Sequence, residues 1–121
     1  MDEEIKPSVA LKLLLESGVP IKHITFTSDV CGSFSGFDPE SGKLIRIEMG
    51  LPDSILRKIK EAVTEDGIPL EIALRVATSN PADILKLTGK GYFRENLGAD
   101  ILILDADFKI VHLMANGKMV K

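Results

Sequence analysis

A run of residues at 24–34, ITFTSDVCGSF, carries the side chains whose types and spacing could do chemistry. Residues 24–27 are β-branched and aromatic, as in a buried strand, and the carboxylate of Asp29 follows almost at once. A carboxylate in that position either closes a turn or serves as a metal ligand and proton carrier. Ser33 lies four residues further on, where its hydroxyl could donate a hydrogen bond to a substrate or simply shape a turn. The residues alone leave both alternatives open.

Few other residues could complete a metal site with Asp29. Cys31 has no basic neighbour in the sequence that would make it a reactive thiolate, so we interpret it as a small loop residue. His23 begins the predicted strand, at the end away from Asp29, and His112 falls in a C-terminal strand, where a surface position is expected. One aspartate is far short of the three or four ligands that hold zinc. Gly-Lys-Gly at 89–91 lacks the spacing of a phosphate-binding loop and is interpreted as a connector.

The composition describes an ordinary globular chain of about one domain. It has 121 residues, 45% hydrophobic and 27% charged, with a net charge of −3. The absence of a basic excess and the scarcity of aromatic residues argue against a nucleic-acid partner. No apolar run approaches the roughly 18 residues of a membrane-spanning helix, and the acidic N-terminus is unlike a signal peptide. The single cysteine cannot form an internal disulfide, so we predict no membrane association and a cytoplasmic location.

The first 88 residues predict an αβα arrangement. A helix over 8–17 starts near Pro7 and stops at Gly18, and the strand over 23–28 follows. Residues 29–52 form a long loop that contains a possible hairpin over 34–48. Apolar periodicity and turn residues then predict three helices, over 53–65, 69–79 and 81–88, the last with Asn80 as its N-cap.

Residues 89–121 differ from the first 88 in composition and predict a separate β portion. A glycine-rich connector leads to strands over 101–104, 110–114 and 118–121, the last two joined by the hairpin turn Asn116-Gly117. The strand over 23–28 is separated from these by about 60 residues of loop and helix. A lone apolar strand with no obvious sheet to join indicates a piece of a larger parallel sheet.

Four motifs in the last third occur in a characteristic order: Asn80-Pro81-Ala82, Gly89-Lys90-Gly91, Gly98-Ala99-Asp100 with Asp105, and Gly117-Lys118. This ordered set resembles the C-terminal end of the amidohydrolase superfamily. Within that superfamily, ITFTSDVCGSF followed by FDPESGKLIRIEMG is similar to the isoaspartyl (β-aspartyl) dipeptidase family. That family has Gly and Asn where this chain has Val30 and Cys31. The resemblance spans the chain but only the last third of such an enzyme.

The resemblance implies an α/β fold, the C-terminal portion of a (β/α)8 barrel together with strands of a small β-sandwich domain. Residues 8–17 would be the last-but-one barrel helix, 23–28 the eighth strand and 53–65 the final helix. Residues 100–121 would be sandwich strands. Active-site residues of such barrels project from the C-terminal ends of the strands, where Asp29 falls.

The resemblance also implies zinc-dependent cleavage of β-aspartyl dipeptides. Asp29 would bind one of two zinc ions and take a proton from the bridging hydroxide, and Ser33 would contact the carboxylate of the dipeptide. The His-x-His and further histidines of the family are absent from this sequence, so the chain alone is expected to hold no zinc and to be inactive. The alternatives are a fragment of a dihydroorotase-like or deacetylase-like amidohydrolase, or a non-enzymatic folded domain. Exposed strand edges would favour a homo-oligomer.

Overall fold

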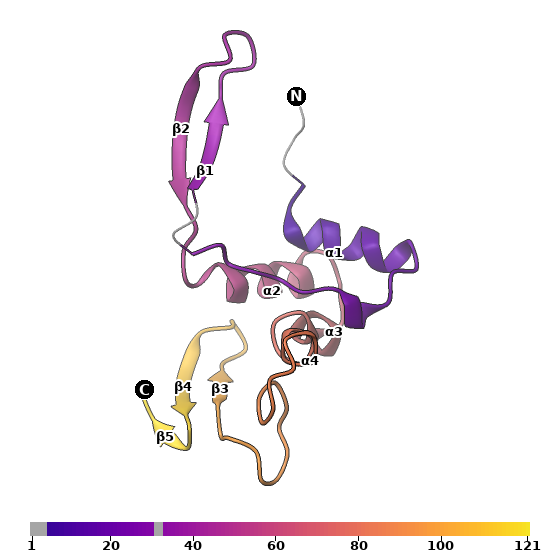
Figure 1. Cartoon of the computed structure of the whole chain (residues 1–121), viewed down its shortest axis with the longest axis vertical. Coiled ribbons are helices and arrows are strands. Elements are labelled where there is room, and N and C mark those ends of the chain that lie inside the picture. Colours follow the sequence, from indigo (N-terminus) through magenta and orange to yellow (C-terminus); the bar gives the residue numbers. More distant parts are fainter. Residues whose placement is uncertain (1–4, 31–32) are drawn as a thin grey trace.

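The structure, a computed structural model, describes residues 5–30 and 33–121, without the side chains at 33, 34, 48 and 49. A hairpin stands out from one end, helices form the middle, and a small sheet lies at the other end (Figure 1). The elements in chain order are α1 (Pro7–Glu16), the 3-10 helix η1 (Ile21–His23), β1 (Ser33–Phe37), β2 (Leu44–Met49), α2 (Ser54–Thr64), α3 (Leu70–Arg75), α4 (Ser79–Ile84), β3 (Ile101–Leu104), β4 (Ile110–Ala115) and β5 (Lys118–Met119).

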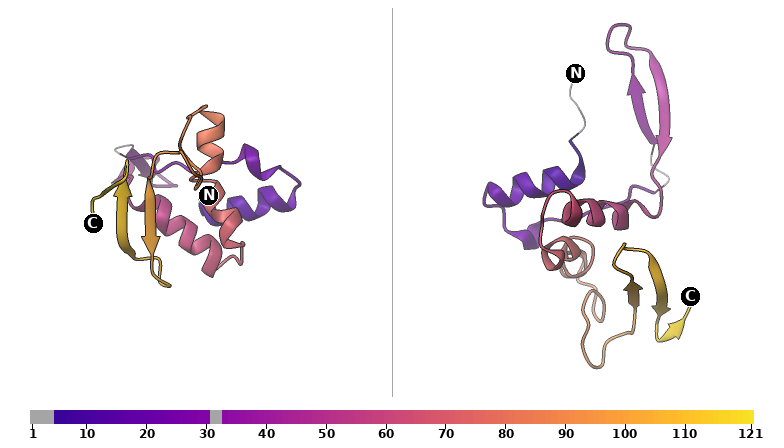
Figure 2. Two further views of the ribbon diagram at one scale, coloured as in Figure 1. Left: turned by 90° about the horizontal axis from the view of Figure 1, so that it is seen from below. Right: turned by 180° about the vertical axis from the view of Figure 1, so that it is seen from behind.

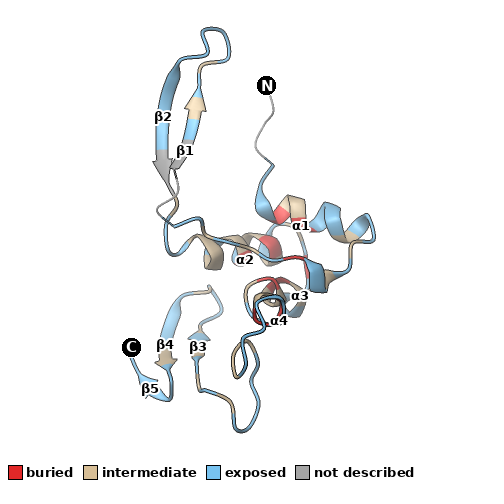
Figure 3. Ribbon diagram, in the orientation of Figure 1, coloured by how far each residue is buried: buried red, intermediate tan, exposed pale blue. Residues whose placement is uncertain are grey.

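The core is small and lies among the helices. Among the residues that the structure describes, the buried ones lie in this middle layer of the molecule (Figure 3). Helix α1 starts at Pro7 as predicted and ends before Gly18, which takes the left-handed conformation (φ +83°) that a helix stop needs. The cluster of buried side chains that joins α1, α2, α3 and the segment after η1 consists of Leu11, Ile24, Ile59, Ala62, Ile68, Ala73 and Val76.

The predicted strand over 23–28 has an extended course beyond His23 but no neighbouring strand in the described part of the chain. His23 ends the 3-10 helix, and residues 24–29 run extended without joining either sheet. Ile24 has extended angles (φ −110°, ψ 131°), and the Phe26 amide donates to the Val76 carbonyl oxygen at 2.9 Å. The later strands do not pair with this segment, so it has the conformation of a strand without neighbouring strands.

The predicted hairpin over 34–48 is confirmed by β1 and β2, which pair antiparallel with Ser35 opposite Ile47. Its tip is closed by Asp38, whose side chain accepts hydrogen bonds from the Ser41 and Glu40 amides at 2.6 and 3.1 Å. The hairpin is far from the core and leaves Phe37, Leu44, Ile45 and Ile47 exposed. A two-stranded hairpin of this kind is marginally stable in isolation, because neither face is covered.

Helices α3 and α4 are shorter than the sequence predicts. Helix α3 ends at Arg75 instead of residue 79, and α4 spans Ser79–Ile84 instead of 81–88. Asn80 is therefore not the N-cap, a position that Thr78 occupies without a side-chain capping bond. The reason is that Asn80 uses its side chain in a long-range contact, described below.

The C-terminal strands form an antiparallel sheet in the order β3-β4-β5. Asn116 and Gly117 both adopt left-handed angles (φ +47° and +75°), as a tight hairpin turn requires, which confirms the predicted turn. Phe108, in the turn between β3 and β4, packs against the helical core, and Lys60 of α2 donates to the Asp107 carbonyl oxygen at 3.1 Å. The sheet is thus attached to α2 through this turn, and Figure 2 shows the sheet beside α2.

The molecule exposes far more surface than a compact protein of its size. Its accessible surface is 9027 Å². A compact monomer of 13.2 kDa has roughly 6,400 Å² by the usual scaling, so the observed area is about 1.4 times larger. Among the described residues, no helix combines the length and apolar character needed to cross a membrane.

Candidate functional site

Asp29 lies at the end of the extended segment, where the chain turns into the hairpin. It is exposed and adopts a left-handed conformation (φ +47°), which aspartate tolerates better than most residues. Its amide donates to the Thr27 Oγ1 atom at 3.3 Å, a local contact that supports the turn. The carboxylate therefore projects from a sharply bent point of the backbone, as either a turn former or a site residue would.

The chain closes on itself beside Asp29. Val30 forms an isolated parallel bridge with Gly50, so the outgoing and returning arms of the hairpin segment meet there. Gly50 lies so close to the backbone that a Cβ atom at this position would come within 3.0 Å of the carbonyl oxygens of Ser28 and Asp29. The base of the hairpin is consequently narrow beside Asp29. We call this closure, formed by residues 28–30 and Gly50, the neck.

Ser33 begins β1, where its backbone pairs with Met49. This register places Ser33 at the base of the hairpin, on the same side of the molecule as the neck. Its side chain, and Cys31 altogether, lie outside the described residues. The predicted role of Ser33 therefore rests on its place in the chain.

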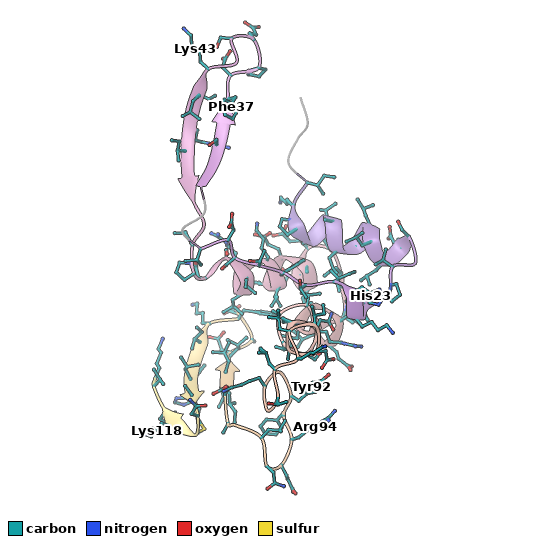
Figure 4. The ribbon with its side chains drawn as sticks, viewed as in Figure 1. His23, Phe37, Lys43, Tyr92, Arg94 and Lys118 are labelled. Atoms are coloured by element: carbon teal, nitrogen blue, oxygen red, sulfur yellow. The ribbon has the colours of Figure 1, made fainter. Side chains whose placement is uncertain are left out.

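The two histidines do not join Asp29. His23 ends η1 and is exposed, at an edge of the helical layer away from the hairpin that carries Phe37 (Figure 4). His112 lies opposite Ile103 in the C-terminal sheet and is exposed, which confirms its predicted surface position. Within residues 5–30 and 33–121, no group of three or more His, Cys, Asp or Glu side chains could hold a metal ion.

Asn80, in the first of the four motifs, holds the start of the extended segment. It is 1% exposed, and its Nδ2 atom donates to the carbonyl oxygens of Ile21 and Ile24 at 2.6 and 2.8 Å. The Oδ1 atom is buried without a hydrogen-bond partner in the described part. The amide orientation that gives Nδ2 two acceptors is the one the surroundings demand. Asn80 thus fixes the backbone that leads to Asp29.

Two of the other motifs meet in one polar cluster, formed by Lys90, Asp100 and the residue that precedes the last motif, Asn116. The Lys90 ammonium forms an ion pair with Asp100 and donates to the Asn116 Oδ1 atom at 3.1 Å. Asp100 also accepts the Asn116 amide at 2.7 Å. These contacts, the amide first and the ammonium second, hold the pKa of Asp100 below its usual range. The cluster ties the connector to one end of the C-terminal sheet, where β3 begins and β4 ends.

Asp105 and Gly91, from two of the motifs, also have structural roles. Asp105 accepts the Asp107 and Lys109 amides at 2.9 and 2.8 Å and so closes the β3–β4 turn. Gly91 is left-handed (φ +79°) and packs against α4, where a Cβ atom would lie 2.8 Å from the Thr78 carbonyl oxygen. These residues build the fold, which confirms the interpretation of 89–91 as a connector.

Comparison with known proteins decides the family. A sequence model of the Amidohydrolase family matches residues 5–120. The chain belongs to the amidohydrolase family. The motifs that carried the resemblance are, in this amidohydrolase chain, the residues that anchor the connector, the C-terminal sheet and the segment before Asp29.

Two solved structures of β-aspartyl dipeptidases are similar to this chain. The β-aspartyl dipeptidase of Fervidobacterium islandicum AW-1, in complex with a β-Asp-Leu dipeptide, matches with a TM-score of 0.83 and 28% identity. That match covers 98% of this chain and 30% of that one. A second structure of a β-aspartyl dipeptidase from the same organism gives a TM-score of 0.76 at 25% identity, over 98% of this chain and 28% of that one. The chain therefore corresponds to less than a third of these relatives.

A deacetylase shares the fold at greater distance. N-acetylglucosamine-6-phosphate deacetylase from Pasteurella multocida matches with a TM-score of 0.65 and 20% identity, over 89% of this chain and 32% of that one. At this identity the match shows the fold alone.

Sequence reasoning missed two residues that shape the site. Asn80 precedes a proline, which favoured the capping interpretation, and its true acceptors lie 56 and 59 residues away in the chain. Gly50 follows a strand and precedes a leucine and a proline, with no turn pattern that would single it out. A buried amide or a close backbone approach of this kind becomes visible only once distant segments are brought together.

Proposed function

We propose that this chain is the C-terminal part of a metal-dependent amidohydrolase that cleaves β-aspartyl dipeptides. The match to the β-aspartyl dipeptidase that was solved with β-Asp-Leu carries this proposal, because it spans nearly the whole chain at 28% identity. Under the proposal, α1, the segment 24–29 and α2 are a helix, strand and helix at the end of a (β/α)8 barrel. Residues 89–121 supply strands to a small sandwich domain.

The extended segment supports the barrel assignment. Residues 24–29 have a strand-like course without a neighbouring strand in the described part. The first of them, Ile24, is buried in the core. In a barrel, such a segment lies between two parallel strands that satisfy its backbone groups. The large accessible surface is also what removal of the rest of a barrel would produce.

Asp29 is proposed as the residue that moves the proton. Hydrolysis of the β-aspartyl amide forms a carbon–oxygen bond with water and breaks the carbon–nitrogen bond. An exposed carboxylate at a strand end can take the proton from the attacking water and deliver it to the departing amino group. Its place at the carboxyl end of the segment is where barrel enzymes carry their catalytic side chains.

Ser33 is proposed to bind the carboxylate of the dipeptide. A hydroxyl can donate one hydrogen bond to that anion. Ser33 starts β1 four residues after Asp29, so the two residues flank the base of the hairpin. A small dipeptide is the partner that this pair would suit.

The residues described here do not by themselves fit a zinc ion. Asp29 is one oxygen ligand, whereas zinc sites need three or four protein ligands, and both histidines lie elsewhere. In the complete enzyme, the other ligands must come from the part that this chain lacks. We therefore propose that the isolated chain neither holds the catalytic metal nor turns over substrate.

A homo-oligomer formed through the hairpin is part of the proposal. Ile45 and Ile47 are 67% and 61% exposed, and both edges of the two-stranded hairpin are free among the described residues. A second copy could cover this apolar surface, since identical edges can pair with one another. The cytoplasmic location remains a prediction.

The alternatives are a deacetylase-like or dihydroorotase-like amidohydrolase and a non-enzymatic domain. The deacetylase match supports the fold that these enzymes share, so substrate class must be measured. The experiment uses the chain expressed with the coding sequence that precedes it, assayed on β-Asp-Leu, dihydroorotate and N-acetylglucosamine 6-phosphate. Hydrolysis of β-Asp-Leu alone is expected. Activity on either of the other substrates instead, or on none of the three, would contradict the proposal.

A further inference from the structure

The neck beside Asp29 depends on a residue without a side chain. Gly50 forms the isolated bridge with Val30, and this contact brings the end of β2 back against the segment that leads into β1. A Cβ atom at position 50 would lie 2.7 Å from the Ser28 carbonyl oxygen and closer still to that of Asp29. Contacts under about 3.0 Å to backbone atoms can be relieved only by moving the backbone, because a carbonyl cannot rotate away like a side-chain end.

The requirement for glycine here is one of space. Gly18 and Gly42 have left-handed angles and open space where a Cβ would lie, so they serve as turn residues. Gly50 has the opposite combination: its φ is outside the left-handed range and its surroundings are filled. Alanine at position 50 would therefore strain its neighbours and leave its own backbone angles acceptable.

The displaced atoms belong to Asp29 itself. Its carbonyl is the nearest group to position 50, and its φ of +47° carries a backbone cost, smaller for aspartate than for most L residues, that the surroundings offset. Upstream, the segment is fixed by the hydrogen bond from the Phe26 amide to Val76 and by Asn80 at Ile24. A Cβ atom at position 50 would consequently displace the backbone of residues 28–30, and this displacement would change the direction of the Asp29 side chain.

We propose that Gly50 is a positioning residue for Asp29: by leaving room for the Asp29 carbonyl, it holds the left-handed turn from which the carboxylate projects. The catalytic part of this inference rests on the proposed role of Asp29. The conformational part does not, since it concerns only the backbone at 28–30 and 50.

The first test measures the conformation in the 121-residue chain by NMR. A left-handed residue gives a strong intraresidue NOE between its amide and Hα protons. This signal is expected at Asp29 in the unaltered chain, lost in Gly50→Ala and kept in Gly98→Ala. Gly98 is a matched control, because its φ is ordinary and a Cβ there would meet nothing closer than 3.6 Å. Persistence of the signal in Gly50→Ala, or failure of that variant to fold, would overturn the proposal.

The second test measures activity in the chain expressed with its preceding coding sequence. Gly50→Ala is expected to lower kcat for β-Asp-Leu by about 10- to 1,000-fold, and Gly98→Ala by less than about threefold. In an Asp29→Asn background, Gly50→Ala should cost less than about threefold, because the group that it positions is already gone. Equal losses in both backgrounds would overturn the positioning role. Absence of β-Asp-Leu activity in the unaltered protein would instead refute the proposed function, and the NMR test would still decide whether Gly50 holds Asp29.

Discussion

At the scale of single residues, the motifs of the amidohydrolase family act in this chain mainly as structural anchors. Asn80 satisfies two carbonyl groups of the segment that leads to Asp29. Lys90 and Asp100 bind each other and Asn116, and so connect two motifs with the hairpin turn at Asn116-Gly117. Asp29 differs from them, because it is exposed and its amide donates to the Thr27 side chain within its own turn. A polar residue that the fold does not need at such a place is the better candidate for chemistry.

Replacing Asn80 by alanine should destabilise the chain by about 2 kcal/mol, because the buried carbonyl of Ile24 loses its Asn80 donor, whereas the carbonyl of Ile21 keeps the Ile24 amide as a donor. The free energy of unfolding in urea measures this loss. Lys12→Ala, at an exposed position in α1, is the control and should change stability by less than about 0.5 kcal/mol. An equal effect of the two substitutions would show that the Asn80 side chain does not hold the segment.

The Asp100 carboxyl should titrate below the ordinary aspartate pKa of about 3.9, because the Asn116 amide and the Lys90 ammonium stabilise its charged form. Its contribution to stability is present above that ordinary value and is lost as the pH falls through the lower folded-state value. Carboxyl NMR titration measures this directly.

Lys90→Met should raise the Asp100 pKa towards the ordinary value, but only in part, since the larger effect comes from the Asn116 amide. Asp38 serves as an internal control. Its pKa is lowered by the Ser41 and Glu40 groups of its own turn, and it should not move in Lys90→Met. An unchanged Asp100 titration in this variant would exclude the ion pair in solution.

Local residue patterns predicted local structure well. Gly18 and Asn116-Gly117 were recognised because a helix stop and a tight hairpin need left-handed backbone angles. Glycine and asparagine adopt these angles at a low cost in conformational energy. The roles of Asn80 and Gly50 could not be predicted, because each depends on a backbone segment that only the folded chain brings near. Residue type and spacing singled out Asp29 and Ser33, but their specific roles came from the family resemblance and stay proposals.

At the scale of elements, the connector 89–100 has more order than its glycine-rich composition indicates. Gly91 presses against α4 through Ala82 and Thr78, and Tyr92 donates to the Asp83 Oδ2 atom at 2.6 Å. That contact is the main reason why the pKa of Tyr92 is raised. Arg94 lies 4.5 Å from the centre of the Tyr92 ring, on the same side of the connector (Figure 4). The connector is therefore fastened to α4 before it enters the sheet.

Gly91→Ala and Gly89→Ala form a matched pair that tests this attachment. Both glycines are left-handed (φ +79° and +80°), but only at Gly91 is the space for a Cβ atom occupied. Gly89→Ala should cost about 1 kcal/mol for its conformation, and Gly91→Ala about 1–3 kcal/mol more for the collision. Urea unfolding of the two variants measures the difference. Equal losses would show that the connector is not packed against α4.

Elements with strong local signals were predicted closely, and those that depend on distant partners were not. The helices predicted over 8–17 and 53–65 match α1 and α2, because apolar periodicity and flanking Pro and Gly define them. The predicted helices over 69–79 and 81–88 run past the observed ends, since turns at 76–78 and 85–86 end them. The strand over 23–28 was read from composition alone, which cannot supply the neighbouring strands.

At the scale of the whole molecule, the chain has a small core and a large apolar surface. Side chains such as Phe37, Ile45, Phe93 and Val120 are more than half exposed, on elements at both ends of the molecule. Apolar exposure on this scale marks surfaces that another part of the protein or another copy covers. It agrees with the length comparison, in which the chain spans 30% of a solved β-aspartyl dipeptidase.

Self-association should depend on the hairpin. Light scattering of the purified chain should show a mass that rises with concentration, and Ile45→Lys with Ile47→Lys should shift it towards the monomer, because charges on a strand oppose edge pairing. Val120→Lys makes a comparable change at an exposed position beyond β5 and should leave the association in place. A monomer at all concentrations, or equal effects of the two sets of changes, would contradict association through the hairpin.

The measurement that tests the central claim most directly is β-Asp-Leu hydrolysis, with zinc supplied, by three proteins. These are the isolated chain, the chain expressed with its preceding coding sequence, and the Asp29→Asn variant of that longer protein. The longer protein is expected to cleave the dipeptide, Asp29→Asn to lower kcat by about 10²–10⁴-fold, and the isolated chain to show no turnover. Turnover by the isolated chain, or full activity in Asp29→Asn, would contradict the account.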